Sequence, residues 1–139
     1  MAWKKVQYQD GKLRTTDDSG GGSGHNYSTT EQLIGTWIDG KPIYEITYNT
    51  GSINAGSTKS VDISSLNIDY VSEIKGCGYS SQYNQSLPLP FVHSQSIYSI
   101  SVNTTASNSV LNANLQISTG SSVSLSKSSV TIQYTKTTD

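Results

Sequence analysis

The chain has 139 residues and a formal net charge of −1, a length that suits a single domain. Ser, Thr, Asn and Gln make up 57 of the residues, and charged residues only 14%, with nine basic against ten acidic side chains, so we expect no nucleic-acid binding. The near-balanced charge argues against a disordered chain. The chain has no run of about 18 apolar residues, which argues against membrane insertion, and its single cysteine cannot form an internal disulfide.

Residues 1–26 differ in character from the rest of the chain. Apolar residues in 2–9, the turn pair Asp10-Gly11 and the polar run 12–16 predict a two-stranded hairpin. The following segment 17–24 (DDSGGGSG) is typical of a flexible linker, because its glycines maximise backbone freedom. We therefore predict an N-terminal hairpin and linker over residues 1–26 and one compact domain over residues 27–139.

Turn signals divide the first half of that domain. Ser28-Thr29-Thr30-Glu31 has the capping-box pattern and predicts one helical turn, and residues 64–67 predict a second. Asp39-Gly40-Lys41-Pro42 separates two apolar runs and predicts a hairpin. Two prolines in the segment 87–91 (LPLPF) exclude it from a central strand, so it is predicted to be an edge or a connector.

Alternation of apolar and polar residues dominates the domain. Residues 111–117 place Leu, Ala, Leu and Ile on one face and Asn, Asn and Gln on the other. The same period of two recurs at residues 44–48, 98–102, 122–125 and 130–134. One buried and one solvated face per strand is typical of antiparallel sheets. Seven to nine short strands at this spacing favour a β-sandwich or a small barrel, and we predict an all-β, antiparallel, jelly-roll-like β-sandwich.

Residue types that carry out catalysis are sparse and scattered. The chain has two histidines, His25 and His93, and Cys77 could pair with His93, but no third orienting residue is indicated, and a buried or half-buried thiol is the simpler interpretation. The chain has neither zinc-ligand spacing nor a calcium loop, and its Gly-rich stretch lacks the Lys-Ser/Thr ending of a phosphate loop. Five scattered acidic residues define no carboxylate pair, because glycoside hydrolysis needs two carboxylates at a specific separation: Glu31, Glu45, Asp62, Asp69 and Glu73. We expect no enzyme activity, metal or cofactor.

Tyrosine is the residue type that points to recognition. Nine tyrosines dominate the aromatic residues, and each offers a broad apolar face and a hydroxyl. Tyr79 and Tyr83 lie in a polar, loop-like segment together with Gln82, and we predict these three as ligand-binding residues. The alternative is that tyrosines line sheet faces as core or inter-subunit packing, and the tyrosines to which this applies are Tyr44, Tyr48, Tyr98 and Tyr134.

Residues 25–44 (HNYSTTEQLIGTWIDGKPIY) carry a family resemblance. This segment resembles one in tail-fibre, head-fibre and minor structural proteins of bacteriophages, especially those of Gram-positive hosts. Residues 57–61 leading to 67–71, residues 87–91 and the end of the chain at 130–139 are similar in order and spacing. The resemblance covers residues 25–139. It implies the β-sandwich tip of a homotrimeric phage fibre, with residues 1–26 as the remnant of a stalk and its junction.

The resemblance implies a virion protein that acts outside the cell and is made in the host cytoplasm without a signal peptide. The first hypothesis is a non-enzymatic receptor-binding module for host adhesion, which recognises a bacterial surface glycan or surface protein through carbohydrate or protein contacts. The second is a purely structural trimerisation or capsid-decoration knob without host contact. The third is a glycan depolymerase tip, for which no catalytic constellation stands out.

Overall fold

The structure is a computed structural model that describes residues 6–9, 12–15, 24–93, 96–107 and 110–139. Strands β1 (Val6–Gln9) and β2 (Lys12–Thr15) pair antiparallel, which confirms the predicted N-terminal hairpin. The turn predicted at residues 10–11 and nearly all of the linker predicted at residues 17–24 lie outside the described residues.

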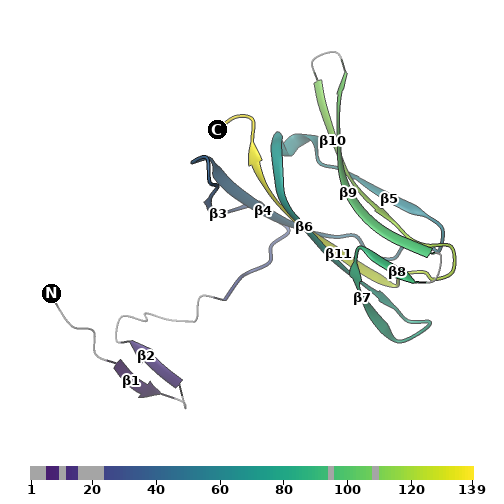
Figure 1. Cartoon of the computed structure of the whole chain (residues 1–139), viewed down its shortest axis with the longest axis horizontal. Helices are drawn as coiled ribbons and strands as arrows, with labels where there is room; N and C mark the ends of the chain where they lie inside the picture. The colour runs from purple at the N-terminus through teal and green to yellow at the C-terminus, as the bar shows by residue number, and fades with distance from the viewer. Residues whose placement is uncertain (1–5, 10–11, 16–23, 94–95, 108–109) are drawn as a thin grey trace.

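Two antiparallel sheets pack against each other in the rest of the described chain (Figure 1). The five-stranded sheet has the order β3-β4-β11-β6-β7, and the four-stranded sheet has the order β5-β10-β9-β8. The strands are β3 (Gln32–Thr36), β4 (Pro42–Asn49), β5 (Thr58–Asp62), β6 (Ile68–Ser80), β7 (Gln85–Leu89), β8 (Phe91–His93), β9 (Ser96–Ser107), β10 (Val110–Ser118) and β11 (Lys127–Lys136). The predicted all-β sandwich is therefore confirmed.

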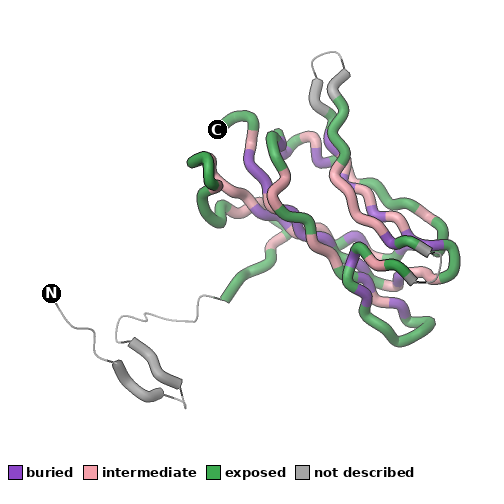
Figure 2. Tube along the Cα trace, viewed as in Figure 1, coloured by how far each residue is buried: buried purple, intermediate pink, exposed green. Residues whose placement is uncertain are grey.

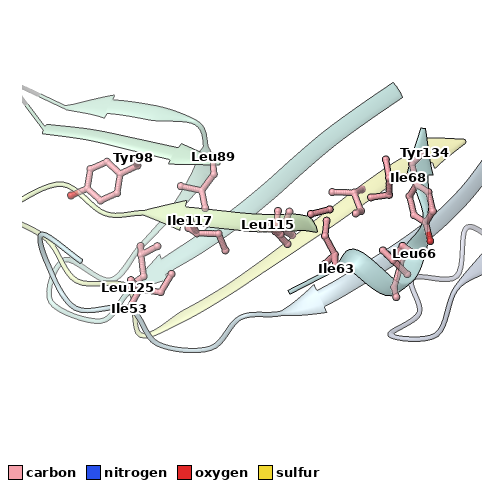
Figure 3. Close-up of a cluster of buried hydrophobic side chains, with 14 of the residues drawn as sticks. Ile53, Ile63, Leu66, Ile68, Leu89, Tyr98, Leu115, Ile117, Leu125 and Tyr134 are labelled. Carbon is pink, nitrogen blue, oxygen red and sulfur yellow. The ribbon is translucent and has the colours of Figure 1, made fainter. Parts of the chain in front are cut away.

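Alternation along the central strands builds the core between the sheets. In β10, Leu115 and Ile117 are 0% and 1% exposed, whereas the intervening Gln116 is partly exposed. In β11, Val130 and Ile132 are buried and face the same cluster. Buried positions follow the line along which the two sheets meet (Figure 2), and the labelled core residues run from Tyr98 at one end to Tyr134 at the other (Figure 3). Burial of these side chains provides the main stabilisation.

Small residues on β6 allow the two sheets to approach each other closely. A Cβ atom at Gly76 would lie 2.5 Å from Ile100 Cδ1 of β9 and 3.1 Å from the carbonyl oxygen of Ser129. A Cβ atom at Gly78 would lie 2.7 Å from Leu125 Cδ1. These two glycines therefore point toward the core, and the residues that alternate with them point outward.

Three local predictions have different outcomes. The turn at residues 64–67 is confirmed as the 3₁₀ helix η1 (Ser64–Leu66), and the proline-containing segment forms β7 at the edge of its sheet. The helical turn predicted at Ser28–Glu31 is wrong, because the Ser28 carbonyl accepts a hydrogen bond from Thr47 N at 2.8 Å and the Ser28 hydroxyl accepts one from Thr30 N at 3.0 Å. The alternation at residues 122–125 produces a single bridge between Leu125 and Ile53.

Candidate functional site

The three predicted ligand-binding residues lie at the β6–β7 hairpin but do not form one patch. Tyr79 is on β6 and points to the outer face of the five-stranded sheet, where its hydroxyl donates to Asn84 Oδ1 at 2.6 Å. Gln82 and Tyr83 belong to the turn, and Gln82 Nε2 donates to the Tyr83 hydroxyl at 3.3 Å. The structure thus brings Gln82 and Tyr83 together in the turn, whereas Tyr79 lies on the outer face because it alternates along β6 with the inward-facing Gly78 and Ser80.

Tyr83 borders a cavity of about 310 Å³ between the two sheets, which we call the Tyr83 pocket. β6 and β7 supply one side of it, β8 and β9 the opposite side, and the loop before β11 completes it. The lining residues are Ser80, Tyr83, Gln85, Leu87, Phe91, Tyr98, Ser122 and Val123. The pocket therefore joins segments that lie more than 40 positions apart in the sequence.

Aromatic side chains form much of the wall of the Tyr83 pocket. The rings of Phe91 and Tyr98 are tilted against each other, with 6.1 Å between their centroids. Tyr98 is 1% exposed and lies at the end of the core (Figure 3), whereas Tyr83 is 58% exposed at the mouth. Burial, and to a smaller extent the nearby Tyr83, raise the pKa of the Tyr98 phenol, so it stays neutral at physiological pH. The pocket thus has an apolar interior and an accessible aromatic edge.

One buried hydroxyl in the Tyr83 pocket lacks a partner. Ser80 is 1% exposed, and its Oγ atom makes no hydrogen bond to any of the described residues. Buried hydroxyls are normally paired, because an unpaired one forfeits its hydrogen bonds to water. Ser80 belongs to the pocket lining, so its Oγ atom is a buried, unpaired hydroxyl at the wall of the pocket.

Tyr79 lines a different region, two adjoining depressions of about 450 and 340 Å³ on the outer face of the five-stranded sheet. Cys77 and Ser129 border both depressions, Tyr27 and Lys75 border the larger one, and Tyr79 the smaller one. Lys75 Nζ lies 5.6 Å from the centroid of the Tyr27 ring, an arrangement typical of a cation–π contact. We call this region the outer hollow.

The interpretation of Cys77 as a buried or half-buried thiol is wrong. It is exposed, because the flanking Gly76 and Gly78 take the inward positions of β6 and leave Cys77 on the outer face. His25 instead pairs with Glu45, with 2.6 Å between Nε2 and Oε1. The side chain of His93 lies outside the described part of the chain.

Acidic side chains take part in separate local contacts. Glu45 is 1% exposed and also accepts a hydrogen bond from Gln133 Nε2 at 2.8 Å, while Glu31 contacts the Tyr134 hydroxyl and Lys136 Nζ. Asp69 pairs with Lys41, and Asp62 accepts hydrogen bonds from Ser64. Within the described residues, no three His, Cys, Asp or Glu side chains gather in a way that could hold a metal ion. The same part of the chain contains no helix long and apolar enough to cross a membrane.

The sequence predicted Tyr83 as a ligand-binding residue but gave no indication that Ser80, Phe91 and Tyr98 line the same pocket. Ser80 follows the inward-facing Gly78 by two positions, so strand alternation could have placed it inward once β6 was extended to residue 80. No sequence signal brings Phe91 and Tyr98 to that point, because they belong to the opposite sheet. Comparison with protein-family models, with curated proteins and with solved structures found no match.

Proposed function

We propose that residues 27–139 form a non-enzymatic binding domain at the tip of a bacteriophage fibre, which recognises a glycan or protein on the bacterial surface. The observation that carries the proposal is the Tyr83 pocket, whose lining combines Tyr83, Phe91 and Tyr98 with Ser80 and its unpaired hydroxyl. Ligand sites are commonly concave and largely apolar, with a few polar groups that orient the ligand. A sugar, with apolar C–H faces and hydroxyls on its rim, fits that description.

Repetition of the site would compensate for its small size. A cavity of about 310 Å³ lies at the lower limit of small-molecule pockets, so each site binds weakly. Three copies on one fibre raise the effective concentration of the second and third sites, and overall avidity rises without new contacts. A homotrimer would therefore bind a repetitive bacterial surface tightly.

Exposed apolar residues near the β3–β4 hairpin support self-association. Ile38 is 91% exposed, Leu33 is 67% exposed, and Tyr70, which packs beside Trp37, is 54% exposed. Packing against a second and third copy would remove this apolar surface from water. The same surface favours the second candidate function, a structural trimerisation or decoration knob without host contact.

Host binding distinguishes the two functions. Labelled protein is applied to a panel of Gram-positive cells and to an array of bacterial glycans, as wild type, as Tyr83→Ala and as Val92→Ala. Val92 is the control because it neighbours Phe91 on the strand but is not among the pocket-lining residues. Its side chain is 63% exposed, a fraction similar to the 58% of Tyr83. We expect wild type and Val92→Ala to bind with equal affinity, and Tyr83→Ala to bind with an affinity at least tenfold lower. Absence of binding to every cell and glycan, or equal binding by Tyr83→Ala, contradicts the receptor-binding proposal.

A further inference from the structure

We propose that the Tyr83 pocket takes a single uncharged sugar ring at the end of a glycan chain, that Ser80 Oγ hydrogen-bonds a hydroxyl of this ring, and that acidic or phosphorylated sugars are rejected. This inference rests on the proposed function and specifies the ligand of the same site. It is carried by two independent observations, the uncharged lining of the pocket and the unpaired hydroxyl inside it.

The lining of the Tyr83 pocket selects against charge. Its eight residues are three aromatic, two aliphatic and three polar but uncharged. A carboxylate or phosphate that entered would lose its hydration and find no cationic side chain in the lining to replace it, and burial of an unpaired charge is costly. The lysines of the outer hollow, Lys75 and Lys127, line the other face of the five-stranded sheet. An uncharged ligand escapes this penalty.

Ser80 favours a ligand that carries a hydroxyl over a purely apolar one. The Ser80 hydroxyl is already buried and unpaired without a ligand, so an aliphatic or aromatic group would gain nothing from it, whereas a hydroxyl would supply the missing hydrogen bond. A sugar hydroxyl at that depth can both donate to and accept from Ser80 Oγ, while the C–H face of the ring packs on the aromatic walls. The combination of apolar faces and hydroxyls within one small ring is therefore what the pocket matches.

Cavity size limits the ligand to one ring. About 310 Å³ accommodates a single pyranose rather than several linked rings, and Tyr83 borders the mouth, where it is accessible to the next unit of the glycan. The terminal, non-reducing sugar would thus enter, and the adjoining sugar would contact Tyr83 and Gln82, whose side chains are hydrogen-bonded to each other.

The test measures binding of small sugars in solution, independently of cells. The chain of residues 1–139 is titrated with glucose, galactose, rhamnose and N-acetylglucosamine, and in parallel with glucuronic acid and glucose 6-phosphate, and the amide signals of residues 80–85 are followed by NMR. We expect at least one neutral sugar to shift these signals with saturation, and both anionic sugars to bind at least tenfold more weakly than that sugar.

Ser80→Ala supplies the second measurement, with Ser72→Ala as the matched control. Ser72 Oγ is the other buried hydroxyl without a partner among the described residues, and Ser72 does not line the pocket. We expect Ser80→Ala to bind the neutral sugar about three- to tenfold more weakly, the effect of one hydrogen bond, without loss of thermal stability. Ser72→Ala should bind the sugar as wild type does.

Any other outcome overturns the sugar assignment, and the outcomes differ according to whether the receptor-binding proposal fails as well. If anionic sugars bind as well as neutral ones, or Ser80→Ala binds as well as wild type, the ligand assignment is wrong even where Tyr83-dependent cell binding persists. If cell binding persists but protease treatment of the cells abolishes it, the partner is a surface protein and the sugar assignment is wrong. If neither cells nor sugars are bound, both proposals fail.

Discussion

Individual residues on the inner face of β6 determine how closely the two sheets pack and what the pocket can bind. Gly76, Gly78 and Ser80 are successive inward positions, and each is smaller than the Ile, Val or Leu usual in a buried strand. The glycines leave room for Ile100 and Leu125, and Ser80 leaves room for the pocket. A one-residue shift would instead direct Cys77 and Tyr79 inward.

A methyl group at Gly78 is expected to destabilise the fold. Gly78→Ala would place Cβ within 2.7–3.2 Å of three atoms of Leu125, which is 1% exposed and has little room to move. We expect a loss of about 1–3 kcal/mol in the free energy of unfolding, measured by urea denaturation. Gly35→Ala is the control, because nothing lies within 4 Å of its Cβ position. Equal stability of the two variants would contradict the close packing described at Gly78.

Asp62 is expected to make stability depend on pH in the acidic range. The hydroxyl and the backbone N–H of Ser64 donate to Asp62 Oδ1 at 2.6 and 3.0 Å, and these bonds hold the pKa of Asp62 below its usual value. A folded pKa below the unfolded one means that the stabilisation is fully present above the unfolded pKa and is lost as the pH falls through the folded pKa. We therefore expect wild type to exceed Asp62→Asn in stability at pH 7, and this difference to shrink as the pH falls below about 4. A difference that grows on acidification would contradict this assignment.

Among the elements, the segment of residues 24–31 ties the beginning of the domain to the five-stranded sheet, and we call it the arm. His25 contacts the buried Glu45, the Ser28 carbonyl accepts from Thr47, and Glu31 reaches Tyr134. These contacts extend to β4 and β11, two neighbouring strands of that sheet. The residue His25 lies on the linker side of the boundary predicted between residues 26 and 27, yet its side chain contacts the sandwich.

Truncation tests the arm. A chain that begins at Gly24 keeps all three contacts, and we expect its free energy of unfolding to equal that of the full chain. A chain that begins at Gln32 loses them and leaves the buried Glu45 carboxylate without its His25 partner, which we expect to cost at least about 1–3 kcal/mol. Urea denaturation measures both chains. Equal stability of the two truncated forms would show that the arm contributes nothing to the fold.

At the scale of the whole molecule, the Tyr83 pocket lies beside the β6–β7 hairpin, and the exposed apolar residues Leu33 and Ile38 lie around the β3–β4 hairpin. β3 and β7 are the two edge strands of the five-stranded sheet, so these two regions are separated by the width of that sheet (Figure 1). Self-association through one region would leave the other open to a ligand.

Light scattering tests whether the chain associates through the exposed apolar residues around the β3–β4 hairpin. We expect the full chain to have the mass of a trimer at micromolar concentration, and Ile38→Ser, which removes the most exposed of these apolar side chains, to shift the equilibrium toward the monomer. Val92→Ser is the control, because Val92 is 63% exposed but lies on β8 of the other sheet. A monomeric wild type, or a trimer insensitive to Ile38→Ser, would contradict association through this surface. Binding of a neutral sugar should be the same for the monomer and the trimer.

Local pattern was sufficient for part of the fold and insufficient for the rest. The alternation at residues 113–117 and 130–134 predicted strands and inward residues correctly, because period two follows from the backbone itself. The same alternation at residues 122–125 produced only one bridge, and the capping-box pattern at Ser28–Glu31 produced no helix. In the second case the backbone hydrogen bond between Ser28 and Thr47, which are far apart in sequence, competes with the local cap.

The sequence by itself determined an all-β fold, the inward-facing apolar residues of β4, β9, β10 and β11, and the polar, uncharged character of the surface. It also predicted that Tyr83 is exposed, because a tyrosine in a polar turn is accessible whichever way the sheets pack. Only the tertiary structure decided that Ser80 lies opposite Phe91 and Tyr98 and that Tyr79 belongs to another face. The physical reason is that these neighbours come from two different sheets, and the relation between sheets depends on the packing of the whole core rather than on any local stretch of chain.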